Sequence, residues 1–243
     1  MTIPAQATEV RRVLITGASS GIGLGIAQAF CAAGARVTAT GATAAEVGAA
    51  AARDPAIEFA VLDVRDAAAV NALVGAIGGL DVLVNCAGVI RRGAEHDPLA
   101  FAEVIDINLT GSMRVCAAAR PGLAARRGCI VNTASMLSFF GGGLVPAYSA
   151  SMGGVAQLTK SLAIAYAVDG IRVNAVAPGW IATPLTQALQ DDPERSKPIL
   201  ARTPMGRWGT PADVAGPVLF LASAAAQFVT GVILPVDGGY LIN

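Results

Sequence analysis

The sequence has little charge and few residues that hold metals or form disulfides. Only 14% of its 243 residues are charged, the formal net charge is zero, and one histidine is present. A neutral chain gives no electrostatic reason to expect nucleic acid or an anionic membrane as a partner. Without a C-x-x-C pair, and with one histidine, the four cysteines predict no metal site. We expect reduced cysteines in a cytoplasmic protein; they are Cys31, Cys86, Cys116 and Cys129.

Hydrophobic runs suited to a membrane are also missing. Residues 1–12 hold no apolar stretch of signal-peptide length. Residues 214–236 carry no charge, but Pro217, Gly231 and several polar side chains interrupt them. A helix followed by a strand is therefore expected there, and not a transmembrane helix.

Short β-type runs alternate with helical patterns along the chain. The expected strands are 11–16, 35–40, 57–62, 80–85, 128–134, 171–177 and 229–236. Helices are expected to about 33 after a glycine-rich turn, near 43–52, at 66–77, from 99 into the 120s, and from 148 to about 169. This alternation predicts a single α/β domain over 1–243 with a parallel sheet.

Residues 179–209 break the alternation, because they are rich in proline and polar residues such as DDPERSKP. They follow a predicted strand, where open α/β sheets bind their ligands. We interpret the segment as a mobile lid over a site. An ordinary surface excursion remains the alternative.

The string TGASSGIG at 16–23 stands directly after a predicted strand and before a predicted helix. Glycines there let the backbone approach a pyrophosphate, and the start of the helix offers free N–H groups and a favourable dipole. A glycine-rich string alone also makes simple tight turns. Its position between a strand and a helix predicts dinucleotide binding.

Several further motifs follow in a fixed order, and together they resemble the short-chain dehydrogenase/reductase family over about 11–240. They are TGASSGIG, Asp63-Val64, NCAG at 85–88, DINLTG at 106–111, NTAS at 132–135, Tyr148, PGWIAT at 178–183 and PVDGGY at 235–240. The resemblance implies a Rossmann-type, doubly wound fold with strand order 3-2-1-4-5-6-7 and helices on both faces. It also implies an NAD or NADP cofactor and hydride transfer between a secondary alcohol and a ketone.

The resemblance assigns seventeen positions to the cofactor. They are Gly17, Ser19, Ser20, Gly21, Ile22, Gly23, Gly41, Asp63, Val64, Asn85, Ala87, Gly88, Tyr148, Pro178, Gly179, Ile181 and Thr183. NAD-preferring members carry an acid at the end of strand two, where this chain has Gly41 followed by Ala42. No acid there repels a 2′-phosphate, and no arginine or lysine attracts one. The choice between NAD and NADP stays open.

The resemblance assigns catalysis to Asn108, Ser135 and Tyr148. Tyr148 would be the acid/base, Ser135 would hydrogen-bond the substrate oxygen, and Asn108 would organise a relay behind them. The pKa of an unperturbed tyrosine is about 10, so its phenol is a poor base at neutral pH. The family places a lysine four residues on, one helical turn away. This chain has Met152 at that lysine position.

Met152 has two interpretations. In the first, the chain carries a single engineered Lys-to-Met replacement that impairs an otherwise active enzyme. In the second, it is a natural, inactive relative that binds cofactor or forms oligomers. The retention of the other catalytic positions favours the first. Lys160 lies too far along the same helix to substitute, and Lys197 lies in the proposed lid.

Apolar residues near the catalytic pair suggest an apolar substrate wall, with core or subunit packing as the alternative. The substrate-site prediction comprises Ser135, Leu137, Phe140, Tyr148, Trp180 and Leu185. Arg91 and Arg92 could meet an anionic substrate but are interpreted as solvated. Members of the family commonly form homotetramers through segments that match 99–123, 148–168 and 230–243 here. A nucleotide-sensing protein and a methyltransferase are the competing function classes.

Overall fold

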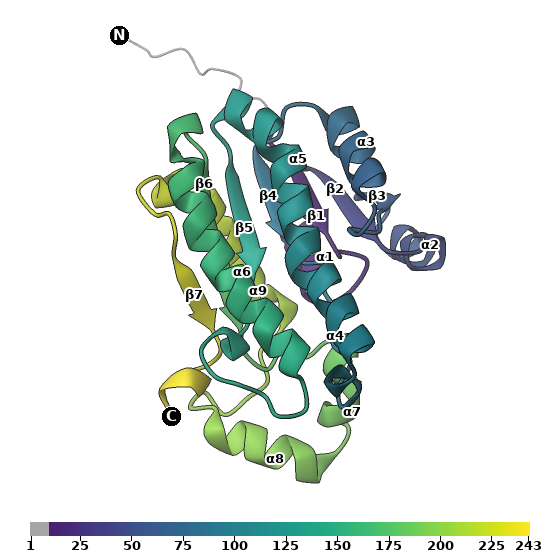
Figure 1. Ribbon diagram of the computed structural model, residues 1–243, viewed down its shortest axis with the longest axis vertical. Coiled ribbons are helices and arrows are strands. Elements are labelled where there is room, and N and C mark those ends of the chain that lie inside the picture. Colours follow the sequence, from purple (N-terminus) through teal and green to yellow (C-terminus); the bar gives the residue numbers. More distant parts are fainter. Residues whose placement is uncertain (1–9) are drawn as a thin grey trace.

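Seven parallel strands form the centre of the computed structural model, which describes residues 10–243 (Figure 1). The strands are β1 (Arg12–Thr16), β2 (Arg36–Gly41), β3 (Glu58–Val61), β4 (Val82–Asn85), β5 (Cys129–Thr133), β6 (Arg172–Pro178) and β7 (Ile233–Val236). Their order is β3-β2-β1-β4-β5-β6-β7, and every neighbouring pair is parallel. The expected doubly wound topology is confirmed. The first part of the N-terminal segment, 1–9, lies outside the described residues.

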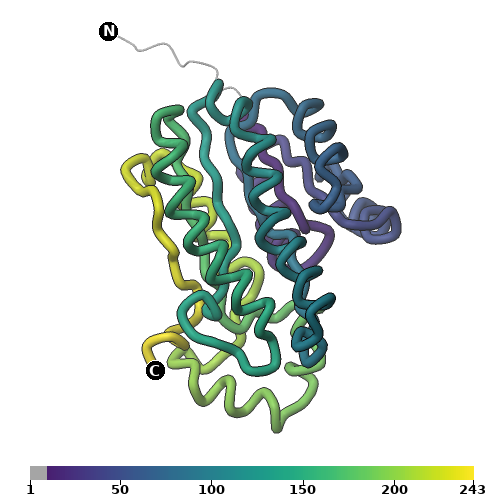
Figure 2. The backbone as a smooth tube through the Cα atoms, in the orientation of Figure 1, coloured from purple at the N-terminus to yellow at the C-terminus, as the bar shows by residue number. Residues whose placement is uncertain are grey.

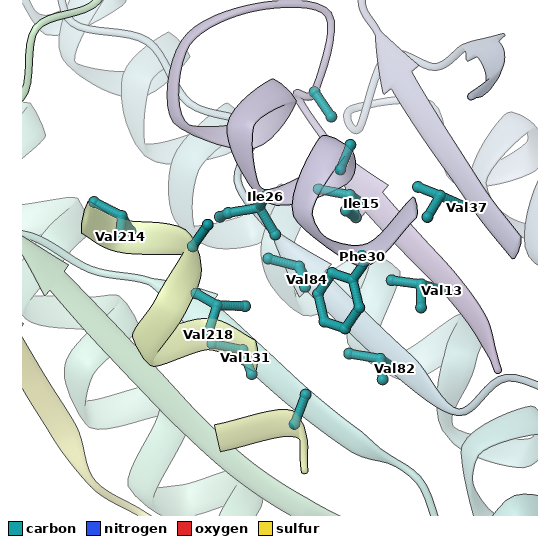
Figure 3. Packing of buried hydrophobic residues seen from close by; sticks show 14 of the residues in the cluster. Val13, Ile15, Ile26, Phe30, Val37, Val82, Val84, Val131, Val214 and Val218 are labelled. Carbon is teal, nitrogen blue, oxygen red and sulfur yellow. The ribbon is translucent and has the colours of Figure 1, made fainter. Parts of the chain in front are cut away.

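The central strands are apolar on both faces because helices cover both. Successive residues of a strand point to opposite faces. Val13 and Ile15 of β1 therefore pack under α1 (Gly21–Ala32) and α9 (Pro211–Ala222), and Figure 3 shows Phe30 of α1 among them. Leu14, between them, faces the other layer. That layer consists of α3 (Ala67–Ile77), α5 (Gly111–Arg126) and α6 (Pro146–Ala165).

Several helices begin at a side chain that accepts hydrogen bonds from the first turn. Thr43 caps α2 (Ala44–Arg53), Asp66 caps α3, and Asp97 caps α4 (Pro98–Ile105). Such caps satisfy backbone N–H groups that have no partner within the helix. The helix α6 differs, because its N-cap residue is Val145, whose side chain makes no such bond.

The long helix expected from residue 99 is interrupted. A π-helical turn, Asp106–Thr110, separates α4 from α5. The Asn108 side chain at this turn bonds both the N–H and the carbonyl of Val89, which fixes the turn against the loop after β4. These hydrogen bonds are tertiary contacts, so the helical periodicity of the sequence does not reveal the interruption.

The last strand is shorter than expected, because it begins at Ile233 and not near 229. Gly231 has a φ of +77°, outside the extended region. The Val173 N–H is bonded to the Thr230 hydroxyl at 3.1 Å. These features replace regular strand pairing before Ile233.

The irregular segment after β6 folds at the carboxyl ends of the strands, beside the C-terminus (Figures 1 and 2). It contains α7 (Gln187–Gln190) and α8 (Pro193–Arg202). Arg202 ties α8 to the C-terminus, with its guanidinium 4.2 Å from the Tyr240 ring centroid and a bond to the Asn243 carbonyl. Within residues 10–243, no helix is both long enough and apolar enough to cross a membrane.

Candidate active site

Two adjoining cavities open at the carboxyl ends of the strands. One, of about 350 Å³, is lined by the glycine-rich loop and by the segments that follow β4 and β5. The other, of about 500 Å³, lies under the segment after β6. Tyr148 and Thr183 line both. A cofactor cavity and a substrate cavity that share a wall would bring two reactants together at that wall.

The first cavity fits a dinucleotide. Gly17 has a φ of +63°, and a Cβ there would lie 2.5 Å from the Cα of Ala87. A Cβ at Gly23 would lie 2.4 Å from the Gly17 carbonyl oxygen. The first bond of α1 joins the Leu24 N–H to the Ser20 carbonyl, which leaves the earlier N–H groups free for an anion. Gly17 and Gly23 therefore let the loop turn tightly against the segment after β4, and both line the cavity.

Two charged side chains lie at the end of β2, where the family resemblance places the adenosine. The Glu46 carboxylate accepts a bond from the Ala42 N–H at 2.9 Å, directly after Gly41. Arg53 donates to the carbonyl of Ser19 at 3.0 Å. The strand itself ends without an acid or a base, as the sequence shows, but α2 brings Glu46 and Arg53 to this place. Both residues reach it from α2, and a search confined to the end of the strand could not find them.

Other predicted cofactor residues differ in placement. Asn85 is 3% exposed, and its side-chain amide donates a hydrogen bond to the Asn132 side chain within the core. It therefore joins β4 to β5 and does not face the cofactor cavity. Asp63 pairs with Arg65 at 2.7 Å, and that hydrogen-bonded guanidinium lowers the pKa of the carboxyl. Neither residue lines the two cavities. Val64 is buried, and its side chain packs closely against Gly111 at the start of α5.

Ser135 and Tyr148 lie together at the wall of the substrate cavity. Ser135 follows β5, and Tyr148 is in the first turn of α6. Burial raises the pKa of the Tyr148 phenol, the hydrogen bond from Ser135 lowers it, and the nearby Cys86 and Glu95 raise it. The net direction is upward, which is the wrong direction for a base at neutral pH.

Met152 lies one helical turn after Tyr148 and lines the cofactor cavity with it. It is 5% exposed and packs with Ala134 and Ala177. Among the residues that line this cavity none is a lysine or arginine. Lys160 and Lys197 are exposed and line neither cavity. The phenol therefore has no ammonium beside it in the described chain.

Asn108 does not line either cavity. It is 1% exposed, and its amide donates to the Val89 carbonyl and to the Ser151 hydroxyl. Its own carbonyl accepts from Ser112 at 2.7 Å. The residue thus joins the loop after β4 to α6, behind Tyr148.

The substrate cavity is lined by the predicted residues and by two arginines outside that prediction. Leu137, Phe140, Trp180 and Leu185 all line it, together with the catalytic pair. Arg92 and Arg195 line it as well, and no Asp or Glu is among its lining residues. Interpreting the pair after strand four as solvated fits Arg91, which ion-pairs Glu103 at 3.3 Å. Arg92 is exposed as well, and it also lines the cavity.

No metal site accompanies these cavities in the described chain. Within residues 10–243, no group of three or more His, Cys, Asp or Glu side chains could hold a metal ion. The four cysteines are free, and burial raises the pKa of Cys86 to about 11. At neutral pH that thiol is protonated and is not a nucleophile.

Comparison with known proteins gives consistent matches along the chain. A family model described as enoyl-(acyl carrier protein) reductase matches residues 17–241. The chain is 41% identical to a 2-dehydro-3-deoxy-D-gluconate 5-dehydrogenase of Pseudoalteromonas atlantica, covering 96% of each. It is 43% identical to a cis-4-hydroxycyclohexanecarboxylate dehydrogenase of Sinomonas cyclohexanicum, covering 95% of this chain and 96% of the relative.

A solved structure also matches at both the sequence and fold levels. It is a gluconate 5-dehydrogenase from Burkholderia cenocepacia in complex with NADP and tartrate, with a TM-score of 0.89 and 36% identity over 96% of each chain. These proteins are dehydrogenases and reductases, which removes the methyltransferase alternative.

Proposed function

The chain belongs to the short-chain dehydrogenase/reductase family and is an NAD(P)-dependent dehydrogenase of that family. We propose that it interconverts a secondary alcohol and a ketone on a small substrate that bears a carboxylate. The observation that carries the substrate class is the pair Arg92 and Arg195 in a cavity lining without an acid. Guanidinium groups bind carboxylates with paired hydrogen bonds. The named substrates of the relatives above include carboxylates, which supports the same class.

The side chains of the cavity wall provide the proton chemistry. A nicotinamide held in the adjoining cavity would supply or take up the hydride. In the oxidation direction, the Tyr148 phenolate accepts the proton of the alcohol, and in reduction the phenol returns it to the forming alkoxide. The Ser135 hydroxyl donates a hydrogen bond to the substrate oxygen. The apolar side chains of Phe140, Trp180 and Leu185 exclude water around the reacting carbon.

Paired substrates test this proposal. We expect the Met152→Lys variant to oxidise hydroxy acids and sugar acids, and to discriminate against the matching neutral alcohols by about 10²-fold or more in kcat/KM. Replacing Arg92 by Gln should remove most of that discrimination, because the carboxylate then loses its charged partner. A matched control is Arg91→Gln, at the neighbouring arginine that does not line the cavity. Equal rates on acids and neutral alcohols would contradict the proposed substrate class.

A second part of the proposal concerns Met152, at the position where a cation is missing. We propose that it stands where the family has lysine, and that the chain has reduced activity for that reason. The intact placement of Ser135 and Tyr148 at the cavity supports a single replacement in an otherwise complete site. The competing interpretation, a natural cofactor-binding protein without activity, predicts that restoring lysine changes nothing.

The charges at the adenosine end make the cofactor preference testable. A 2′-phosphate near Gly41 would be repelled by Glu46 and attracted by Arg53. We expect Glu46→Gln to tighten NADP binding relative to NAD, and Arg53→Gln to weaken it, each by about three- to tenfold at low salt. Fluorescence titration of both cofactors measures the two ratios. If the ratio of NADP to NAD affinity shifts in the same direction in both variants, or shifts in neither, these residues do not face the phosphate.

Assembly into a homotetramer is also proposed. Large apolar side chains lie exposed on the elements concerned, with Leu99 81% exposed on α4, Ile164 81% on α6 and Ile242 89% near the C-terminus. Apolar groups exposed in this way are typical of subunit interfaces. Sedimentation velocity on the unmodified chain measures the assembly.

We further propose that 179–209 acts as a lid, since Leu185 and Arg195 reach the substrate cavity from it.

A further inference from the structure

The helix that carries Tyr148 begins without a cap of its own. Its N-cap is Val145, which has no polar side chain, and Pro146 follows without an N–H. The N–H of Tyr148 lies in the first turn, ahead of the first bonded N–H, which is that of Ser149. A buried N–H without a partner is costly, so an acceptor must come from elsewhere.

Glu95 supplies that acceptor from another element. It lies in the short helical turn Ala94–His96, between β4 and α4, and is 1% exposed. One carboxylate oxygen accepts from the Tyr148 N–H at 2.8 Å, and the other accepts from the Arg91 N–H at 2.8 Å. Burial of a carboxylate is costly unless it is paired and hydrogen-bonded. Here two backbone N–H groups and the positive end of a helix stabilise the charge.

Further contacts join the same two segments. The Gly93 N–H donates to the Leu144 carbonyl at 2.8 Å, and a ring nitrogen of His96 lies 3.0 Å from the Gly143 carbonyl. The turn is therefore held against the loop that leads into α6. That turn follows Arg92, which lines the substrate cavity. One buried carboxylate thus links the arginine side of the cavity to the tyrosine side.

We propose that Glu95 is a positioning residue, which caps α6 from outside and fixes the Tyr148 phenol relative to the substrate cavity. This inference rests on the proposed function only in taking Tyr148 as the acid/base. The sequence did not reveal Glu95, because an isolated glutamate 53 positions before Tyr148 has no local pattern.

Glu95 affects the Tyr148 phenol through its negative charge as well as through the hydrogen bond that positions the helix. The groups with an electrostatic effect on the phenol are Cys86, Glu95 and Ser135, and Met152 beside it is neutral. Arg92 and Arg195 line the substrate cavity that the phenol also lines. Because a negative charge disfavours the phenolate, neutralising Glu95 lowers the pKa of Tyr148.

Hydrogen exchange tests the cap without any substrate. We expect Glu95→Ala to speed exchange of the Tyr148 and Arg91 amides by at least about tenfold, since their acceptor is lost. Glu95→Gln keeps one carbonyl acceptor and should speed exchange less. The control is Asp97→Ala, which removes a neighbouring cap, on Leu99 and Ala100, and none of the hydrogen bonds at the start of α6. Unchanged protection of both amides in Glu95→Ala would overturn the proposal.

A functional readout separates positioning from simple stability. In the Met152→Lys background, Glu95→Ala should lower kcat by about 10- to 100-fold with the KM for cofactor unchanged. Glu95→Gln should shift the rise of the rate to lower pH, and ¹³C labelling of the three tyrosines follows the same titration in the absence of turnover. If Met152→Lys is inactive, the proposed function fails while the exchange and titration results still decide this inference. A Tyr148 titration that is identical in parent and Glu95→Gln contradicts it.

Discussion

Replacing Met152 by lysine is expected to raise kcat/KM for alcohol oxidation at neutral pH by about 100- to 1,000-fold. Met152 lines the cofactor cavity beside Tyr148, so an ammonium there would stabilise the phenolate. A unit charge about 4–5 Å away is worth roughly 3–4 kcal/mol at an effective dielectric of about 20. That energy lowers the tyrosine pKa by about two to three units. Steady-state rates from nicotinamide absorbance measure the gain.

A neutral variant distinguishes charge from packing in this experiment. Met152→Gln adds polarity and hydrogen bonding at similar length but no charge, so its rate should stay close to that of the parent. Cofactor affinity of the parent, titrated in parallel, should be measurable because the glycine-rich loop at Gly17 and Gly23 is intact. If Met152→Lys remains as inert as the parent, the interpretation as a single missing cation is wrong.

Removing the Tyr148 hydroxyl from the Met152→Lys variant should lower kcat by about 10³-fold, with cofactor binding unchanged. A phenylalanine keeps the ring packing but can neither accept nor donate the proton. Ser135→Ala should cost less, about 10²-fold, because it removes one hydrogen bond to the substrate oxygen. Single-turnover rates with saturating cofactor give both values.

Tyr166 provides a matched control for this prediction. It ends the same helix, is 4% exposed, and stacks under the Arg120 guanidinium at 4.5 Å, but it lines neither cavity. Tyr166→Phe should keep the catalytic rate. A Tyr148→Phe variant that retains more than about a tenth of the rate would exclude Tyr148 as the acid/base.

Much of the fold follows from local patterns. The central strands, such as Val82–Asn85, are apolar on both faces, and the glycine-rich loop stands between a strand and a helix. These features depend on residues that are close in sequence, and they predicted the sheet order once the family resemblance was recognised. Boundaries were less accurate where tertiary contacts intervene, as at the π-helical turn held by Asn108 and at Gly231 before β7.

Most of the site residues that the sequence did not reveal act across long separations, and Glu46, four residues from its partner Ala42, is the exception. Arg195 reaches the substrate cavity from α8, and Glu46 returns to the end of β2 from the first turn of α2. Glu95 caps a distant helix through the N–H of Tyr148, 53 residues later. Charged side chains of this kind look like ordinary surface residues until the fold brings them together, so only the structure assigns them partners.

The pH dependence of one ratio tests the missing-cation account most directly. The ratio is kcat/KM of Met152→Lys divided by that of the parent, for oxidation of one hydroxy acid. Burial raises the pKa of Tyr148 in the parent, so its rate should continue to climb with pH after the lysine variant has reached its plateau. We predict a large ratio at neutral pH that falls steadily as the pH rises. A ratio that is large but independent of pH, or close to one throughout, would contradict the account.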